Sequence, residues 1–215
     1  PIFVKINKKF GEKRLISRLK KGVFGIESDF VEKNPKKVSF SRKDWKDPVQ
    51  LLTNDKSGSS GRAKMYWAEK NIIPKGTNYL DDYKVIMSSA YPKKTIVSGG
   101  ATVENIKRRI NDLVEVLPPN SAFGSSRLSL FMSKNEKDCD NFMKYIKTTF
   151  FAGLALQEPN RRSSFGLIIP DQDFTDKSDI DWSKSIAEID KQLYKKYGLD
   201  KKEIDFIESM IKPME

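Results

Sequence analysis

Two Asp-x-Lys triplets come nearest to catalytic chemistry in this sequence, Asp44-Trp-Lys46 and Asp82-Tyr-Lys84. In metal-dependent nucleases a carboxylate at this spacing binds Mg²⁺, and the lysine supports the attacking water. The pattern also arises often by chance in a chain whose charged residues make up 32% of the total. We therefore interpret both triplets as surface pairs or strand ends first, and we keep a stand-alone Mg²⁺-dependent nuclease as an alternative.

Acidic residues gather in the segment that runs from Asp171 to Asp181, at positions 171, 173, 176, 179 and 181. Their oxygen atoms are the ligands that a hard cation prefers, but the segment lacks the glycine and the terminal glutamate of a calcium loop. We expect an acidic linker that leads into helices, and we predict no metal ligands.

Several catalytic classes are excluded by residue types that the chain lacks. It has no histidine and a single cysteine, Cys139, which removes Ser-His-Asp and Cys-His catalysis, zinc ribbons and an internal disulfide. Asp138 and Asp140 flank the cysteine and disfavour its thiolate. No glycine-rich phosphate loop occurs. We therefore predict no catalytic residues and no cofactor bound by this chain, and we expect a reducing, cytoplasmic setting.

The net charge of +11 is unevenly distributed along the 215 residues. Residues 1–170 hold 32 Lys+Arg against 17 Asp+Glu, whereas residues 171–215 hold 8 against 12. No stretch approaches the 18 uninterrupted apolar residues of a membrane span. A basic body with an acidic tail indicates a polyanionic partner for the body, and double-stranded DNA is the first candidate.

Arginine and lysine stand among small, flexible residues in three predicted loops, Gly61-Arg-Ala-Lys64, Ser125-Ser-Arg127 and Asn160-Arg-Arg-Ser-Ser164. Such loops approach a duplex closely and contact phosphates or guanine edges. The predicted DNA contacts are Arg62, Lys64, Ser125, Arg127, Arg161 and Arg162. Tyr66 and Trp67 have rings that would stack on a base, although core packing is the simpler interpretation.

The elements that must position these loops alternate irregularly, which favours an α+β fold. Strands are predicted at 82–89, 127–132 and 165–169, and residues 62–70 and 103–117 fit a helix or a strand equally. A capping box of Ser133 and Glu136 predicts one helix whose apolar face is Phe142, Ile146, Phe150 and Leu154. Two further helices are predicted, from Ile186 to a stop at Gly198 and after a capping box of Asp200 and Glu203. We therefore expect a mixed-sheet body over 1–170 and, over 171–215, an acidic linker with a C-terminal helical hairpin.

From about residue 62 onward the order of landmarks resembles one known family. The segments that carry the resemblance are Leu80-Asp-Asp-Tyr-Lys-Val-Ile-Met-Ser-Ser-Ala90, Lys144-Tyr-Ile-Lys-Thr-Thr-Phe-Phe151, Ile169-Pro-Asp-Gln-Asp-Phe174 and Ile189-Asp-Lys-Gln-Leu-Tyr-Lys-Lys-Tyr-Gly-Leu199. They look like the C-terminal target-recognition region of Eco57I-like restriction–modification enzymes and related N6-adenine DNA methyltransferases. The similarity spans roughly two thirds of the chain, while residues 1–60 match poorly.

In that family the catalytic domain precedes this region and holds the adenine with an Asn-Pro-Pro-Tyr-type motif. Leu117-Pro-Pro-Asn120 is not that motif, because its amide follows the prolines. The resemblance thus implies a DNA-reading fragment of a bacterial defence enzyme. Its parent would bind S-adenosylmethionine, with Mg²⁺ if a nuclease domain is present, and a methyltransferase domain in the same or a partner chain would do the chemistry. A basic protein–protein adaptor is the second alternative.

Overall fold

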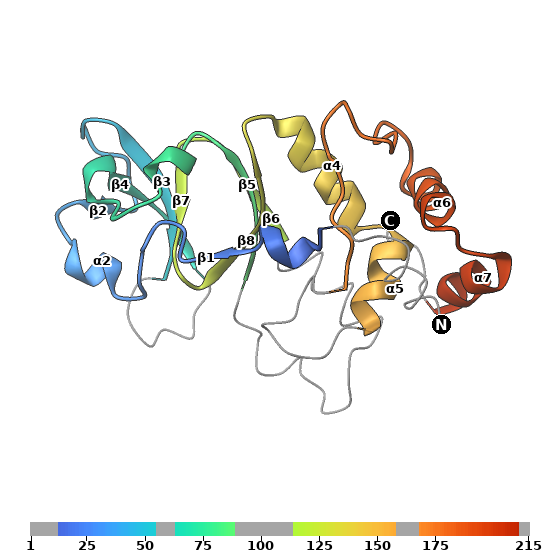
Figure 1. Ribbon diagram of the computed structural model, residues 1–215. Coiled ribbons are helices and arrows are strands. Elements are labelled where there is room, and N and C mark those ends of the chain that lie inside the picture. The colour runs from blue at the N-terminus through green and yellow to red at the C-terminus, as the bar shows by residue number, and fades with distance from the viewer. Residues whose placement is uncertain (1–12, 55–62, 89–113, 158–167, 211–215) are drawn as a thin grey trace. The chain divides into compact units, whose positions relative to one another are not determined.

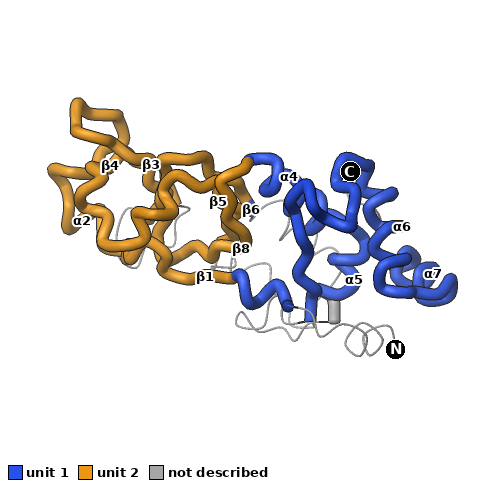
Figure 2. The backbone as a smooth tube through the Cα atoms, turned by 45° about the horizontal axis from the view of Figure 1, so that its top comes forward, with its two compact units in different colours: residues 1–18, 92–114, 136–215 blue, residues 19–91, 115–135 orange. Residues whose placement is uncertain are grey.

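The computed structural model describes residues 13–54, 63–88, 114–157 and 168–210 (Figure 1). It confirms the α+β class, with two sheets and a set of helices that are separated along the chain. The chain forms two compact units (Figure 2). Unit 2 consists of residues 19–91 and 115–135, and unit 1 consists of residues 1–18, 92–114 and 136–215. Residue 170, where we expected the body to end, falls inside unit 1.

Unit 2 contains two four-stranded sheets. The first has the order β1-β8-β5-β6, formed by Lys20–Lys21, Arg127–Ser133, Tyr83–Ser88 and Val114–Leu117. The second has the order β2-β4-β3-β7, formed by Val38–Ser39, Lys64–Glu69, Pro48–Thr53 and Ser121–Phe123. In the second sheet β4 is antiparallel to both β2 and β3, whereas β7 runs parallel to β3. The short helix α2, Phe30–Lys33, and two 3₁₀ turns, Lys70–Ile72 and Thr77–Tyr79, also belong to unit 2, whereas the 3₁₀ turn Leu15–Arg18 belongs to unit 1.

One apolar core holds both sheets of unit 2 together. It takes Ile86 and Leu117 from the first sheet and Leu51 and Tyr66 from the second, all of them buried. The ring of Phe24 packs edge-on against Phe123 with centroids 5.2 Å apart. Successive side chains of β4 point to opposite faces of the sheet, so Tyr66 and Ala68 point into this core while Met65 faces solvent.

The described helices of unit 1 are α4, Glu136–Ile146; α5, Thr149–Gln157; α6, Ile186–Tyr197; and α7, Lys201–Met210. Aromatic rings pack between them, and Phe150 stacks on Tyr197 with centroids 4.9 Å apart. None of the helices in the described ranges has the length and apolar character that crossing a membrane requires.

The apolar stripe from Phe142 to Leu154 is buried as predicted, but the prediction of one continuous helix is wrong. The chain breaks the helix at residues 147–148. Thr148 Oγ1 accepts a hydrogen bond from the Phe151 N–H at 3.1 Å, and this bond starts α5 anew. Ser133 is not the cap of α4 either, because its Oγ accepts from the Asn135 N–H and the helix begins only at Glu136.

Of the other predicted elements, most are confirmed and one strand is not. The strands at 82–89 and 127–132 are confirmed as β5 and β8, and 62–70 contains a strand, β4. The stop at Gly198, whose φ is +62°, and the capping box of Asp200 and Glu203 are also confirmed. The strand at 165–169 is not formed in its described part, because Ile168 and Ile169 are bends and only Pro170 makes an isolated bridge, to Arg14. The helix-or-strand segment 103–117 is described only from residue 114, where it is strand β6.

Candidate nucleic-acid interface

Sheet register brings two of the predicted DNA contacts to one end of the second sheet. Lys64 opens β4 opposite Thr53, the last residue of β3. Ser125 follows β7, and its neighbour Gly124 donates its N–H to Leu52 O on β3 at 2.9 Å. Lys64 is exposed and Ser125 is half-buried. These two residues therefore lie at the same end of the second sheet.

Arg127 is placed differently from a loop residue that reaches a duplex. It is the first residue of β8, and its side chain is only 12% exposed. Its guanidinium donates to Glu115 Oε1 at 3.2 Å and to Ser88 Oγ at 3.3 Å. The remaining predicted contacts, Arg62, Arg161 and Arg162, lie outside the described residues.

A group of aromatic and cationic side chains occupies the same sheet, and of these only Lys64 was predicted as a DNA contact. We call Phe40, Arg42, Lys64, Met65 and Trp67 the aromatic–cation patch. Phe40 directly follows β2 and is 65% exposed. The Lys64 ammonium lies 5.8 Å from the centroid of its ring, and the Arg42 guanidinium lies 5.3 Å from the centroid of Trp67. Both distances are within the range of cation–π attraction.

The loop between β2 and β3 adds exposed positive charge beside this patch. Arg42, Lys43 and Lys46 are all exposed, and none of them forms an ion pair with a carboxylate in the described ranges. Elsewhere in the unit the cations Lys33 and Lys37 do pair, with Asp29 and Glu69. The sequence signal for this loop was present in the alternation Phe40-Ser-Arg-Lys-Asp-Trp-Lys46.

Unit 1 carries a second basic surface, an open hollow of about 670 Å³ between α4 and the start of α6. Its lining includes Lys137, Lys144, Lys147 and Lys184 against one carboxylate, Asp140. Lys137 pairs with Asp176 at 2.7 Å, and Lys144 donates to Trp182 O at 2.7 Å. No ion pair involving Lys147 is found among the described residues. The hollow therefore has the chemistry of a phosphate-contact surface.

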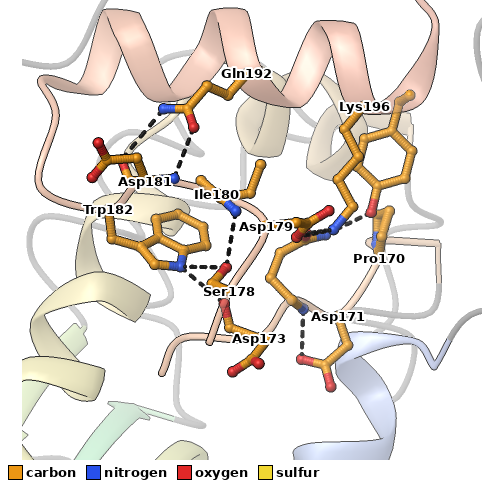
Figure 3. A network of polar contacts seen from close by, with 12 residues as sticks. Pro170, Asp171, Asp173, Ser178, Asp179, Ile180, Asp181, Trp182, Gln192 and Lys196 are labelled. Carbon is orange, nitrogen blue, oxygen red and sulfur yellow. Dashed lines mark hydrogen bonds and ion pairs between the residues drawn. The ribbon is translucent and has the colours of Figure 1, made fainter. Parts of the chain in front are cut away.

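The carboxylates of the acidic segment 171–181 make hydrogen bonds and ion pairs within the chain. Each of its five carboxylates binds a different partner, so they do not converge on a common point. Figure 3 shows one of these contacts, between Asp179 and Lys196. Asp171 binds Arg18 at 2.6 Å and Asp179 binds Lys196 at 2.9 Å. Asp181 accepts from the Ser183 hydroxyl and N–H, and these bonds lower the pKa of its carboxyl. Within the described part of the chain, no group of three acidic, cysteine or histidine residues is placed to hold a metal ion.

The geometry around Asp82 and Lys84 argues against a nuclease pair. Lys84 is completely buried, and its ammonium donates to the backbone oxygens of Leu80 at 3.0 Å and Asp82 at 2.6 Å. The Asp82 carboxylate instead lies 2.7 Å from the ammonium of Lys134. Asp44 and Lys46 are both exposed on the β2–β3 loop. The Lys84 ammonium is committed to holding the backbone, so it is not available to an attacking water.

The chain matches no family model, no curated protein and no solved structure. Its function is therefore inferred from the arrangement of side chains described above and from the resemblance in the sequence.

The two basic surfaces differ in one respect that bears on function. In the hollow two of the lysines are already in ion pairs and the one ring, Trp182, is buried, whereas the aromatic–cation patch combines cations with the exposed ring of Phe40 and the half-buried ring of Trp67. Nucleic acids present both phosphates and aromatic bases, so the patch offers groups complementary to each. It is the better candidate for the interface.

Proposed function

We propose that this chain is a DNA-binding module that recognises a short duplex sequence for an N6-adenine methyltransferase of the restriction–modification type. The observation that carries DNA binding is the set of exposed cations on the β2–β3 loop, Arg42, Lys43 and Lys46. They lack carboxylate partners in the described ranges, and Arg42 lies over the half-buried ring of Trp67. A cation that already has a carboxylate partner releases few counterions on binding, whereas one without such a partner gains the most from a phosphate.

The assignment to restriction–modification enzymes rests on the resemblance of the segments between Leu80 and Leu199. In this proposal the chain supplies specificity in the bacterial cytoplasm, and a separate domain supplies S-adenosylmethionine binding and methyl transfer. An accompanying nuclease domain would use Mg²⁺. The ion pair of Asp82 and the backbone hydrogen bonds of Lys84 favour this division over cleavage by the chain itself.

The experiment is a selection from a randomised duplex library across a salt series, followed by sequencing of the retained DNA. We expect one short motif to be enriched, and affinity to fall steeply as salt rises. Salt-sensitive binding without enrichment would leave a DNA-binding module and remove sequence recognition. No binding at low salt would overturn the proposal in favour of the adaptor, and Mg²⁺-dependent cleavage would overturn it in favour of the nuclease.

Variants that remove positive charge test whether the β2–β3 loop is the DNA-binding surface. Replacing Arg42, Lys43 and Lys46 together by glutamine should weaken binding and reduce the slope of log affinity against log salt by up to about 3, roughly one for each phosphate that is no longer neutralised. The matched control replaces Lys191, Lys195 and Lys202 by glutamine. These lysines are also exposed and lie on α6 and α7, and their replacement by glutamine removes the same net charge. Equal losses of affinity in both variants would show that total charge matters and the β2–β3 loop does not.

A further inference from the structure

Phe40 is a large apolar side chain that the fold leaves in solvent and yet holds in place. Its ring is stacked on Tyr66, with centroids 4.5 Å apart and planes inclined by 28°. Tyr66 is itself only 2% exposed and belongs to the core of unit 2. Contact with a buried ring restricts the rotamers that the exposed ring can adopt, which reduces the entropy that it loses on binding.

The charges around this ring indicate what covers it. Lys64 lies over the ring of Phe40, Arg42 lies over the ring of Trp67, and Lys43 adds an exposed cation nearby in sequence. Lys64 and Tyr66 lie on the same face of β4, whereas Trp67 points to the other face, so a flat, aromatic and negatively charged partner would complement Phe40 and Lys64 together. A nucleobase with its own phosphate has that combination, and stacking on an aromatic side chain is tolerant of base identity.

Stacking within the duplex decides which base such a ring can reach. Inside a duplex both faces of each base are already covered by its neighbours, so a protein ring gains full stacking only with a base that has left the stack or ends it. We infer that Phe40, supported by Tyr66 and flanked by Lys64, stacks on an unpaired nucleobase. The inference rests on the proposed DNA binding and adds to it a preference for DNA in which one base is unpaired.

The test compares three DNAs of equal length: a matched duplex, the same duplex with one unpaired central nucleotide, and the single strand. Wild-type protein should bind the two DNAs with unpaired bases about tenfold more tightly than the matched duplex, the scale of one stacked base. With 2-aminopurine as the unpaired base, binding should quench its fluorescence because stacking does so. Phe40→Ala should abolish both the preference and the quenching, and Phe40→Trp should retain them.

Phe206→Ala is the control, since Phe206 is 53% exposed on α7 in unit 1 and is not in the patch. It should leave the preference unchanged. Circular dichroism confirms folding of each variant; Phe40 is exposed, so its removal does not open the core. Equal, salt-sensitive binding of matched and unpaired DNA by wild-type protein would overturn this inference and leave the proposed function intact. A preference that survives in Phe40→Ala would also overturn it. Absence of binding to all three DNAs would overturn both.

Discussion

The carboxylate of Asp190 on α6 accepts a hydrogen bond from the backbone N–H of Phe150 at 2.8 Å, across 40 residues of sequence. Its second oxygen accepts from the Thr149 N–H at 2.9 Å. Both N–H groups belong to the first turn of α5, where a helix has donors without internal partners. One side chain of α6 therefore caps α5 and fixes the point at which the predicted long helix is interrupted.

Asp190 should make the stability of unit 1 depend on pH. Burial raises the pKa of its carboxyl to about 6, against an ordinary value of 3.8, although the two backbone hydrogen bonds oppose this shift. The folded state thus holds the proton up to a higher pH than the unfolded state does. Its stabilising contribution is complete below about pH 4 and is lost as pH rises through 6, a change of about 3 kcal/mol.

Asp190→Asn isolates this contribution because the amide does not titrate. Denaturant unfolding followed by helical circular dichroism should show wild-type protein losing stability relative to the variant between about pH 4 and 7. The other carboxyl groups are present in both proteins, so their contributions to the pH dependence of stability cancel in the comparison. Parallel stability curves for the two proteins would contradict the assignment. Asp190→Ala, which removes both acceptors, should be less stable than Asp190→Asn at every pH.

Replacing Asn120 by glycine should lower the stability of unit 2 less than replacing it by alanine. Its φ is +58°, a conformation that costs most residues about 1–2 kcal/mol. Its side-chain amide donates to Pro48 O at 2.9 Å, and its own N–H donates to Leu80 O at 2.7 Å. Asn120→Gly removes only the side-chain hydrogen bond, about 1 kcal/mol, whereas Asn120→Ala adds strain and should cost about 2 kcal/mol. Unfolding of unit 2 followed by tryptophan fluorescence measures both, and equal losses of stability would refute the strain argument.

Gly124 should tolerate no side chain while Thr53 is present. A Cβ at this position would lie 2.5 Å from Thr53 Oγ1 and 3.2 Å from its Cβ. Gly124→Ala should therefore destabilise unit 2, and Thr53→Ala in the same protein should recover part of the stability. A double-mutant cycle in urea measures this coupling. Additive changes would mean that the loop before β8 moves away instead.

The lysine-lined hollow of unit 1 should contribute phosphate contacts if the proposed DNA binding is correct. Lys147→Gln together with Lys184→Gln should reduce the salt slope of DNA affinity by about 1–2 and leave sequence preference unchanged. Lys191→Gln together with Lys195→Gln is the matched control, since both of these exposed lysines lie on α6 away from the hollow's lining. Filter binding at several salt concentrations distinguishes the pairs. An unchanged slope in the first pair would exclude the hollow from the interface.

Local patterns were sufficient for much of the fold. The strands β5 and β8 and the helices α6 and α7 were predicted because their turns, caps and periodicity lie within a few residues of each element. The break between α4 and α5 was missed because Asp190, which caps α5, is distant in sequence. Its acceptor function depends on how α6 packs, which no local pattern encodes.

The candidate site was predicted less well, for a related physical reason. Lys64 was predicted correctly as an exposed cation, but Arg127, at the junction of a predicted loop and the strand 127–132, was expected to reach DNA and is instead held by Glu115 and Ser88. Phe40 lies at the end of an apolar run in the sequence, and only the pairing of β2 with β4 places it on Tyr66. Exposure of a hydrophobic ring is a tertiary property, so the sequence could suggest the alternation but could not reveal the surface.

The interleaving of the two units also sets an order for their synthesis. The last residue of unit 2 is Asn135, whereas unit 1 needs residues from both ends of the chain. During translation the sheets of unit 2 can close while α5 still lacks the carboxylate that will cap it. The N-terminal part of unit 1 must then wait for the ribosome to deliver α6 and α7, so its folding comes after translation of nearly the whole chain. A ribosome stalled shortly after Asn135 has left the exit tunnel would hold a folded unit 2 and an unfinished unit 1.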